Sequence, residues 1–288
     1  MELACETQLT PIAQFSVTQN YDSYTDSDHE AWRCAMRALL NVLESRCAVP
    51  YEIALRQCGL NAHRLPRLSE INEALTRFGW QTMMVDSFIP PPTFMGLQAQ
   101  RILPITRHVR AYSQLGYTPI PDIIHEAAGH LPMLVEPKYR RFLQRFGEEG
   151  ERLRYSELDE RVYVAQKRYA EFAGLPNRDV ATLNEFRDEL EVLRIQQKQA
   201  LTPACLLSRF HWWTVEYGMV GGSAKLFGAG LLSSSTEALA SDETRKERLS
   251  LACLDYDYEI SRMQPQLFVA DDWTHLNEQL SRVIRYIG

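Results

Sequence analysis

The chain has 288 residues, of which 45% are hydrophobic and 24% charged, a composition typical of a globular protein with a sizeable core. The formal net charge of -6 gives no electrostatic case for binding nucleic acid. The N-terminus has no basic stretch followed by an apolar core, and no apolar run reaches about 18 residues, so neither a secretory signal nor a membrane span is expected. The six cysteines form no C-x-x-C pair, which predicts reduced thiols in a cytoplasmic protein.

The N-terminal part of the chain changes from polar to periodic. Residues 1–28 are polar with few apolar anchors, which predicts a loosely packed arm ahead of a single domain. Apolar residues recur at helical spacing over 29–46, with Asp28 as the expected N-cap. Two further helices are predicted over 50–58 and 68–79.

Short extended segments follow. GWQTMMVDSF (79–88) is typical of a strand, and 102–110 of another short extended segment. Between them lies IPPPTF (89–94), whose three prolines lack amide donors, so we expect a rigid loop there.

The long charged stretch 149–201 carries two apolar stripes at helical spacing, which predicts two antiparallel helices joined by a short turn. Small residues and serines in 225–239 are typical of a close-packed loop that leads into a helix. Helices are also predicted over 242–254 and 271–288. The sequence therefore predicts one mainly α (α+β) domain over 29–288, with a few short strands and no dividing linker.

Candidate metal ligands lie in PDIIHEAAGHLPML (121–134), a predicted helix that should end near Gly129 and Pro132. His125 and His130 are five residues apart, which on a regular α-helix separates them by about 140°. Both imidazoles can reach one ion only if the helix ends or unwinds between them. The spacing therefore disfavours the H-E-x-x-H pattern of zinc proteases.

A third candidate ligand is Glu216, which lies in the aromatic segment WWTVEYG. A buried carboxylate is costly unless it is paired or bound to metal. Two imidazoles and one carboxylate leave open positions on an octahedral ion, as in iron(II) oxygenases. Simpler interpretations remain open: buried histidines in the core, a glutamate paired with an arginine, and Asp122 as a helix cap.

Three motifs together resemble one known family. PDIIHEAAGHLPML resembles the iron-binding segment of the aromatic amino acid hydroxylases, the family of phenylalanine, tyrosine and tryptophan hydroxylases. HWWTVEYG (211–218) resembles the segment with their glutamate ligand, and KLFGAGLLSS (225–234) their substrate loop. The motifs occur in the family's order, and the likeness covers about residues 86–270. It implies that 29–288 is a catalytic domain of this type, with 149–201 as a helical-hairpin insertion.

The resemblance implies an iron centre and a pterin site. His125, His130 and Glu216 match the Fe(II) ligands and would be the catalytic centre. Phe94 matches the aromatic residue that stacks on the pterin, and Glu126 matches an acidic pterin contact. From the sequence alone, the preferred interpretation of Phe94 is a core aromatic after a proline loop. The implied cofactors are Fe(II) and a tetrahydropterin, tetrahydrobiopterin or a related compound, which activate molecular oxygen.

The resemblance also implies an amino acid pocket. Arg110 matches the arginine that binds the substrate carboxylate, for which a guanidinium offers a bidentate fork; its ordinary alternative is a surface arginine. Ser234 would support a metal ligand from behind. The remaining matches to the pocket lining are Thr118, Pro121, Trp212 and Ser233.

Several features depart from the familiar family members. The interval from His130 to Glu216 is longer, and the extra residues correspond to the helical pair at 149–201. That pair would cover the active-site mouth, form a dimer contact, or do neither. His211 replaces a tyrosine beside the pterin, and Leu103 replaces a histidine. We expect a monomer or dimer rather than the family's tetramer, and no control by a regulatory domain.

The expected function is ring hydroxylation of an aromatic L-amino acid, foremost phenylalanine to tyrosine. Phenylalanine 3-hydroxylation and tryptophan 5-hydroxylation are alternatives with the same mechanism, because the shape of the pocket decides between them. A zinc hydrolase with Glu126 as base and a non-catalytic binding protein are alternatives of other classes. No nucleic acid or membrane partner is expected.

Overall fold

The computed structural model describes residues 12–115, 121–175, 177–258 and 263–288. Most of the elements in these ranges are helical, and the strands are short. The prediction of a mainly helical fold with a few strands is therefore confirmed. None of the helices in the described ranges combines the length and the apolar character that crossing a bilayer requires.

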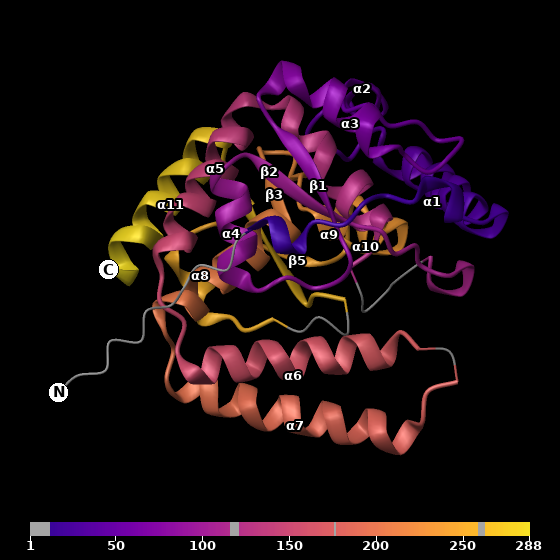
Figure 1. The fold of residues 1–288 in the computed structure, drawn as a ribbon. Coiled ribbons are helices and arrows are strands. Elements are labelled where there is room, and N and C mark those ends of the chain that lie inside the picture. Colours follow the sequence, from indigo (N-terminus) through magenta and orange to yellow (C-terminus); the bar gives the residue numbers. More distant parts are fainter. Residues whose placement is uncertain (1–11, 116–120, 176, 259–262) are drawn as a thin grey trace.

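The first helices pack along one side of the molecule (Figure 1). Helix α1 (Asp26–Leu43) begins earlier than predicted, because Thr25 and not Asp28 is its N-cap. The Thr25 side chain accepts from the Asp28 amide, and the Asp28 carboxylate accepts from the Thr25 amide. This capping box satisfies two amides of the first turn. The next two helices are α2 (Tyr51–Gln57) and α3 (Leu68–Leu75).

A parallel strand pair follows, with a helix between its strands. Strands β1 (Gln81–Val85) and β2 (Ile102–Thr106) pair in parallel. Helix α4 (Pro91–Ala99) connects them, so the prediction of a loop over 89–94 was wrong. Pro90 is the N-cap, and the next two prolines fill the first helical positions. Amides there have no partner within the helix, so a missing N–H costs nothing.

Helix α5 (Pro137–Arg152) lies against α4. A Cβ atom on Gly147 would collide with the α4 backbone at Ala99 and Met95, so the two helices approach closely at this glycine. The last residues of α5 cover 149–152, which were predicted to begin the inserted hairpin.

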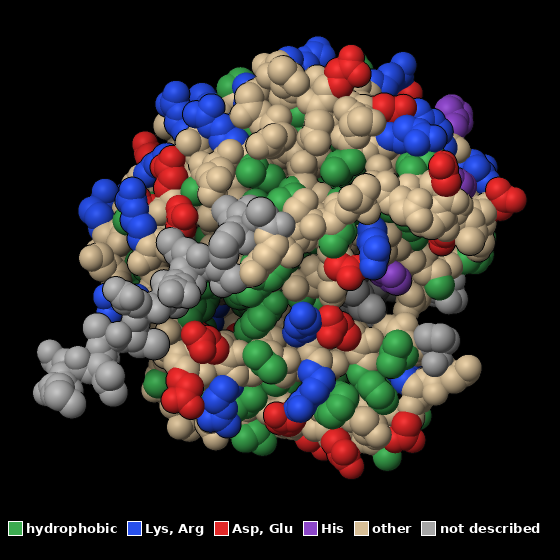
Figure 2. Space-filling view, in the orientation of Figure 1, with side chains coloured by type: hydrophobic (Ala, Val, Ile, Leu, Met, Phe, Trp, Pro, Cys, Tyr) green, Lys and Arg blue, Asp and Glu red, His purple; other side chains and the backbone are tan. Residues whose placement is uncertain are grey.

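The predicted antiparallel pair is present as α6 (Glu157–Ala173) and α7 (Val180–Gln199). The two helices lie side by side along one edge of the body (Figure 1). They bury a small cluster of their own, separate from the main core: Val162, Ala165, Leu190 and Leu193. Figure 2 shows hydrophobic side chains on the hairpin and along its border with the body.

Helix α8 (Pro203–His211) leads into a second sheet with strand order β4-β3-β6-β5. Its strands are β3 (Gly218–Val220), β4 (Lys225–Leu226), β5 (Arg245–Arg248) and β6 (Gln266–Ala270). The predicted helix over 242–254 was wrong: it contains β5 and the 3-10 turn η8 (Leu251–Asp255). Pairing of β5 with β6 overrides the local helical pattern, and its charged side chains suit an edge strand.

The remaining helices close the fold around the main core. Short α9 (Ala229–Leu232) and α10 (Ser235–Ala240) follow β4. The predicted helix is α10, whereas β4 and α9 occupy part of the segment that was predicted to be a loop. Helix α11 (Trp273–Ile287) ends the chain and packs on α5. The core draws on every part of the body, and its largest fully buried side chains include Trp32, Trp213, Phe142, Phe210 and Phe268.

Candidate metal centre and its pocket

The three candidate ligands lie on two π-helical turns. His125 and His130 are on η5 (Ile124–His130), and Glu216 ends η7 (Trp212–Glu216). In a π-helix each amide bonds to the carbonyl five residues back, so residues five apart lie nearer to one face than in an α-helix. Of the two expected alternatives, the helix does not end between the histidines; it is locally underwound there. A wider turn brings them together, and η6 (Leu131–Val135) continues the chain as a 3-10 helix.

Close backbone packing holds the first π turn in place. A Cβ atom on Gly129 would lie 2.7 Å from the carbonyl oxygen of Ala229 on α9. The buried Tyr51 hydroxyl donates to the Ala128 carbonyl at 2.9 Å. Gly129 is thus required by the approach of α9, and not because it stops a helix.

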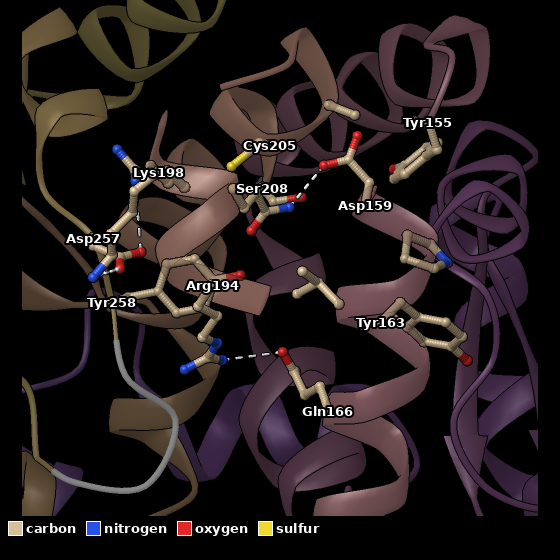
Figure 3. A pocket seen from close by; sticks show the side chains of 15 residues that line it. Tyr155, Asp159, Tyr163, Gln166, Arg194, Lys198, Cys205, Ser208, Asp257 and Tyr258 are labelled. Carbon is tan, nitrogen blue, oxygen red and sulfur yellow. Dashed lines mark hydrogen bonds and ion pairs between the residues drawn. The ribbon is translucent and has the colours of Figure 1, made fainter. Parts of the chain in front are cut away.

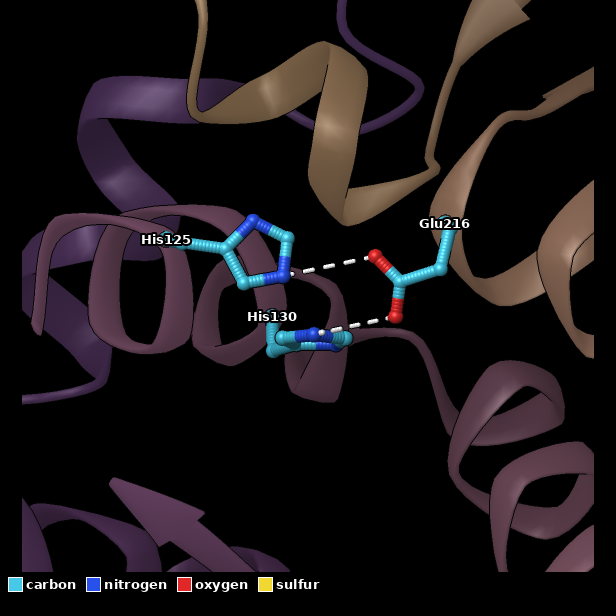
Figure 4. Close-up of side chains that lie close together, drawn as sticks. All are labelled: His125, His130 and Glu216. Carbon is cyan, nitrogen blue, oxygen red and sulfur yellow. Dashed lines mark ion pairs between the residues drawn. The ribbon is translucent and has the colours of Figure 1, made fainter. Parts of the chain in front are cut away.

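The candidate ligands converge on one point (Figure 4). The Glu216 carboxylate lies between the imidazoles, with Oε2 3.3 Å from His125 Nε2 and Oε1 3.5 Å from His130 Nε2. One potential ligand atom from each residue lies within 4.8 Å of the others. Their side chains are 23%, 4% and 13% exposed for His125, His130 and Glu216, so the group opens on the His125 side.

Electrostatics at this centre favour a positive charge. Burial raises the pKa of Glu216, but His130 and His125 more than reverse this and hold its pKa well below the ordinary range. Burial lowers the pKa of His125, while Glu216, Glu126 and Asp122 raise it, with a net rise to about 9. Burial dominates at His130 and lowers its pKa to about 3. A carboxylate between two imidazoles is a ready donor set for a divalent cation.

The two imidazoles are supported differently. His125 Nδ1 lies 3.0 Å from Ser233 Oγ, a hydrogen bond that fixes its ring. His130 Nδ1 is buried and has no hydrogen-bond partner among the described residues, so no hydrogen bond at Nδ1 fixes that ring. Ser234, predicted to support a ligand, caps α10 by accepting from the Glu237 amide.

Arg110 and Asp122 form a buried ion pair beside the histidines. Arg110 Nε donates to Asp122 Oδ2 at 2.8 Å and Nη2 to Oδ1 at 2.6 Å, with side chains 3% and 0% exposed. Asp122 Oδ1 also accepts from the His125 amide at 3.0 Å, as a helix-capping side chain does. The sequence had suggested only the cap; nothing in it showed that the same carboxylate pairs with Arg110.

The three candidate metal ligands and Arg110 line one cavity of about 270 Å³. Of the residues singled out in the sequence, those that reach it are Phe94, Arg110, Pro121, His125, Glu126, His130, His211, Trp212, Glu216, Ser233 and Ser234. Thr118 lies outside the described residues. Leu103 is a buried core residue of β2 and does not line the cavity. Lining residues that the sequence did not reveal are Phe88, Gln166, Tyr217, Gly230 and Glu237.

The candidate pterin contacts lie together in this cavity. The rings of Phe94 and His211 are 5.8 Å apart between centroids, with planes at 79°. Burial raises the pKa of Glu126 to about 8, helped by Glu216 and Asp122 and opposed by His125. Glu126 is thus a carboxyl group that can carry a proton near neutral pH.

Trp212 forms part of the cavity wall and is held in place by a stacking contact and a hydrogen bond. It stacks on Tyr258 at 4.4 Å between centroids, and its Nε1 donates to Gln264 Oε1 at 3.1 Å. An indole held in this way offers a rigid apolar surface to a ring-shaped ligand.

The family model for the biopterin-dependent aromatic amino acid hydroxylases matches residues 15–151 and 185–287. The phenylalanine-4-hydroxylase of Pseudomonas aeruginosa is 29% identical over 259 residues, which cover 88% of this chain and 81% of that protein. That of Chromobacterium violaceum is 24% identical over 269 residues, which cover 91% of this chain and 75% of that protein.

Solved structures of the Chromobacterium violaceum phenylalanine hydroxylase share the fold. The structure with bound iron(III) and the oxidised cofactor 7,8-dihydrobiopterin has a TM-score of 0.72 at 23% identity. The match covers 95% of this chain and 86% of that chain. The structure with iron and phenylalanine has a TM-score of 0.68 at 22% identity, with 95% and 87% covered. The resemblance seen in the sequence is confirmed, since the family model accounts for most of the chain. The chain belongs to the biopterin-dependent aromatic amino acid hydroxylase family.

Proposed function

We propose that this chain is an Fe(II)- and tetrahydropterin-dependent monooxygenase that hydroxylates L-phenylalanine to tyrosine, with molecular oxygen as co-substrate. The observation that carries the proposal is the convergence of two imidazoles and one carboxylate at the wall of a cavity that also holds Arg110. The similar proteins of Pseudomonas aeruginosa and Chromobacterium violaceum are phenylalanine-4-hydroxylases, which supports phenylalanine as the substrate.

His125, His130 and Glu216 fit a divalent metal. Their donor atoms already face one another, and three protein ligands leave positions for oxygen and water on an octahedral ion. To bind through Nε2, His125 must keep its proton on Nδ1, from which it donates to Ser233 Oγ. When bound, Fe(II) and the reduced pterin would supply the activation of oxygen, chemistry that no side chain provides.

The amino acid would be held by its charge and by its ring. Asp122 occupies Nε and Nη2 of Arg110, whereas among the described residues Nη1 makes two long contacts of 3.4 Å, with the carbonyls of Leu115 and Ser233. Nη1 is thus the nitrogen of Arg110 that can donate to a substrate carboxylate. Pro121 and Trp212 would clamp the aromatic ring, and the pterin would lie between Phe94, His211 and Glu126.

Product analysis tests the reaction. Purified protein is loaded with Fe(II) and given tetrahydropterin, oxygen and either phenylalanine or tryptophan, and products are separated by chromatography and mass spectrometry. We expect a single 4-hydroxyphenylalanine product. A 3-hydroxyphenylalanine or 5-hydroxytryptophan product would replace the substrate assignment and keep the mechanism. Oxygen-independent hydrolysis that requires zinc would sink the proposal.

Removal of one ligand tests the metal centre. In His130→Ala, one of three donors is lost, so we expect iron affinity to fall by at least about 100-fold and turnover to disappear. Bound iron is measured by elemental analysis, and circular dichroism checks that the fold remains. Leu103→Ile, a core change outside the cavity, serves as the control. Normal turnover by iron-loaded His130→Ala would refute the assigned ligands.

We further propose that the enzyme works in the cytoplasm as a monomer or dimer. The absence of paired cysteines among the described residues is consistent with a reducing compartment. Light scattering on the purified chain, at several concentrations, would measure the oligomeric state directly; a tetramer would contradict this proposal.

A further inference from the structure

Helix α6 of the inserted hairpin contributes a residue to the catalytic cavity. The family match leaves out residues 152–184, and this interval contains all of α6. Half-buried Gln166 on α6 nevertheless lines the cavity that contains His125 and Glu216. Gln166 also borders a second cavity of about 130 Å³, which lies between the hairpin and α8 and is drawn in Figure 3. The insertion is therefore a wall of the site.

The orientation of the Gln166 carboxamide follows from its partner. Arg194 on α7 donates from Nη2 to Gln166 Oε1 at 3.1 Å (Figure 3). A guanidinium can only donate, so the oxygen must face Arg194 and the NH2 group must face away from it. No hydrogen bond between described residues uses Gln166 Nε2. The carboxamide of this cavity-lining residue is thus fixed in orientation, and its NH2 group is a donor that the described residues do not use.

Other contacts keep α6 in position. The buried Asp159 carboxylate on α6 accepts from Gln197 Nε2 at 2.7 Å and from Thr202 Oγ1 at 2.9 Å, which joins α6 to α7 and to the start of α8. Near the other end of α6, Ser87 Oγ donates to Glu171 Oε1 at 2.7 Å. Ser87 neighbours Phe88, which also lines the catalytic cavity. Contacts near both ends of α6 therefore hold the helix that carries Gln166 in place.

The chemistry of the proposed ligands selects the partner of this donor. In the proposed function, the phenylalanine carboxylate is taken by Arg110, and a phenyl ring has no acceptor for a conventional hydrogen bond. The pterin carries a carbonyl oxygen, ring nitrogens and, in biopterin, side-chain hydroxyls. We infer that Gln166 donates a hydrogen bond from Nε2 to an acceptor of the bound pterin, so that the inserted hairpin takes part in cofactor recognition. This inference rests on the proposed pterin site.

Binding measurements separate this role from a merely structural one. The iron-loaded protein is titrated with 7,8-dihydrobiopterin by calorimetry, and separately with phenylalanine. In Gln166→Met the side-chain volume is kept and the donor is lost, so we expect pterin affinity to fall roughly 5- to 10-fold with unchanged phenylalanine affinity. In Gln166→Glu an acceptor replaces the donor, and the loss should be larger. Gln196→Met, an exposed glutamine on α7, is the matched control and should bind as the wild type does.

Each outcome bears on one claim. Equal pterin affinity in Gln166→Met, Gln166→Glu and wild type would overturn the inference, as would a loss confined to phenylalanine binding. If the wild type itself binds no pterin, the proposed function fails instead. Thermal unfolding and circular dichroism of each variant show whether a loss of affinity arises from a damaged fold.

Discussion

Arg110 has a structural task in addition to its proposed role in substrate binding. Its ion pair with Asp122 is almost completely buried. Removing one partner of such a pair leaves an uncompensated charge in the interior, which typically costs 3–5 kcal/mol. The two tasks of Arg110 must therefore be separated experimentally.

For Arg110→Ala we predict a loss of about 3–5 kcal/mol in the free energy of unfolding together with weaker phenylalanine binding. Denaturant unfolding and calorimetry measure the two effects. The double variant Arg110→Leu/Asp122→Leu removes both charges and should recover much of the stability, but none of the binding. If amino acid affinity returned with the stability, Arg110 would have no direct contact with the substrate.

Glu237 gives a prediction about pH. Burial raises its pKa to about 7 from an ordinary 4.5, although a hydrogen bond with Tyr217 lowers it somewhat. Below pH 4.5 the carboxyl is protonated in both the folded and unfolded states. Between 4.5 and 7 the unfolded chain releases a proton that the folded protein keeps, so the free energy of unfolding falls as pH rises, by on the order of 3 kcal/mol.

Glu237→Gln removes this titration. We predict that the variant gains stability relative to wild type as pH rises through this window, and that the difference is constant above it. Chemical denaturation at a series of pH values measures the difference. A difference that does not change with pH would show that Glu237 is already ionised in the folded protein.

The sequence predicted single residues unevenly. His125, His130 and Glu216 could be recognised because residue type, spacing and an aromatic setting all favoured a metal site. Asp122 was visible only as a helix cap, since an ion pair with Arg110 depends on how two segments pack. Glu237 and Gln166 carried no local signal, because ordinary acidic and amide side chains become notable only when the fold brings them to the cavity.

Among the elements, η5 is the one on which the metal site depends, and Gly129 is its contact with α9. Gly129→Ala would place a methyl group 2.7 Å from the Ala229 carbonyl oxygen. We predict a loss of about 1–3 kcal/mol in stability and weaker iron binding, because the backbone between the two histidines must shift. Unfolding curves and bound-iron analysis measure both.

Gly222→Ala is the control for this change. A Cβ atom on Gly222 meets nothing within 4 Å, so the same substitution should leave both stability and iron binding unchanged. Equal behaviour of the two variants would mean that the backbone of η5 yields without consequence.

At the scale of the elements, the sequence indicated the long amphipathic helices well. It indicated the proline-initiated helix, the edge strand and the π turns poorly. The helices α1, α7 and α11 follow a clear apolar periodicity and were predicted within a few residues. Helix α4 was missed because prolines disfavour helix interiors, although they are tolerated at the first turn. Strand β5 was missed because its pairing with β6 is non-local, and the π turns have no recognised local pattern.

At the scale of the molecule, α6 and α7 form a hairpin along one edge of the body (Figure 1). It buries its own small cluster, and Asp159 brings its two ends together by accepting from the Ser156 amide and the Thr202 hydroxyl. A short linker can therefore replace residues 157–201. This local closure, like the single mainly helical domain, could be expected from the helical-hairpin pattern, whereas the contact of α6 with the cavity could not.

For this deletion we predict cooperative unfolding with a loss of roughly 1–3 kcal/mol, retained iron and phenylalanine binding, and a pterin affinity reduced at least as much as in Gln166→Met. Calorimetry and denaturant unfolding provide the measurements. Pterin binding equal to that of the full chain would exclude a role of the hairpin in the cofactor site. Light scattering on the same sample would show whether the hairpin also mediates dimer formation.

The wide turn between the histidines also determines how near this site lies to a different chemistry. The segment H-E-A-A-G-H is one alanine longer than H-E-x-x-H, the spacing with which two histidines on one α-helical face bind zinc in metalloproteases. Loss of a single in-frame codon, for Ala127 or Ala128, would create that spacing with Glu126 placed as the hydrolytic base. The register of one helical turn, rather than the identity of the ligands, thus distinguishes the two sites.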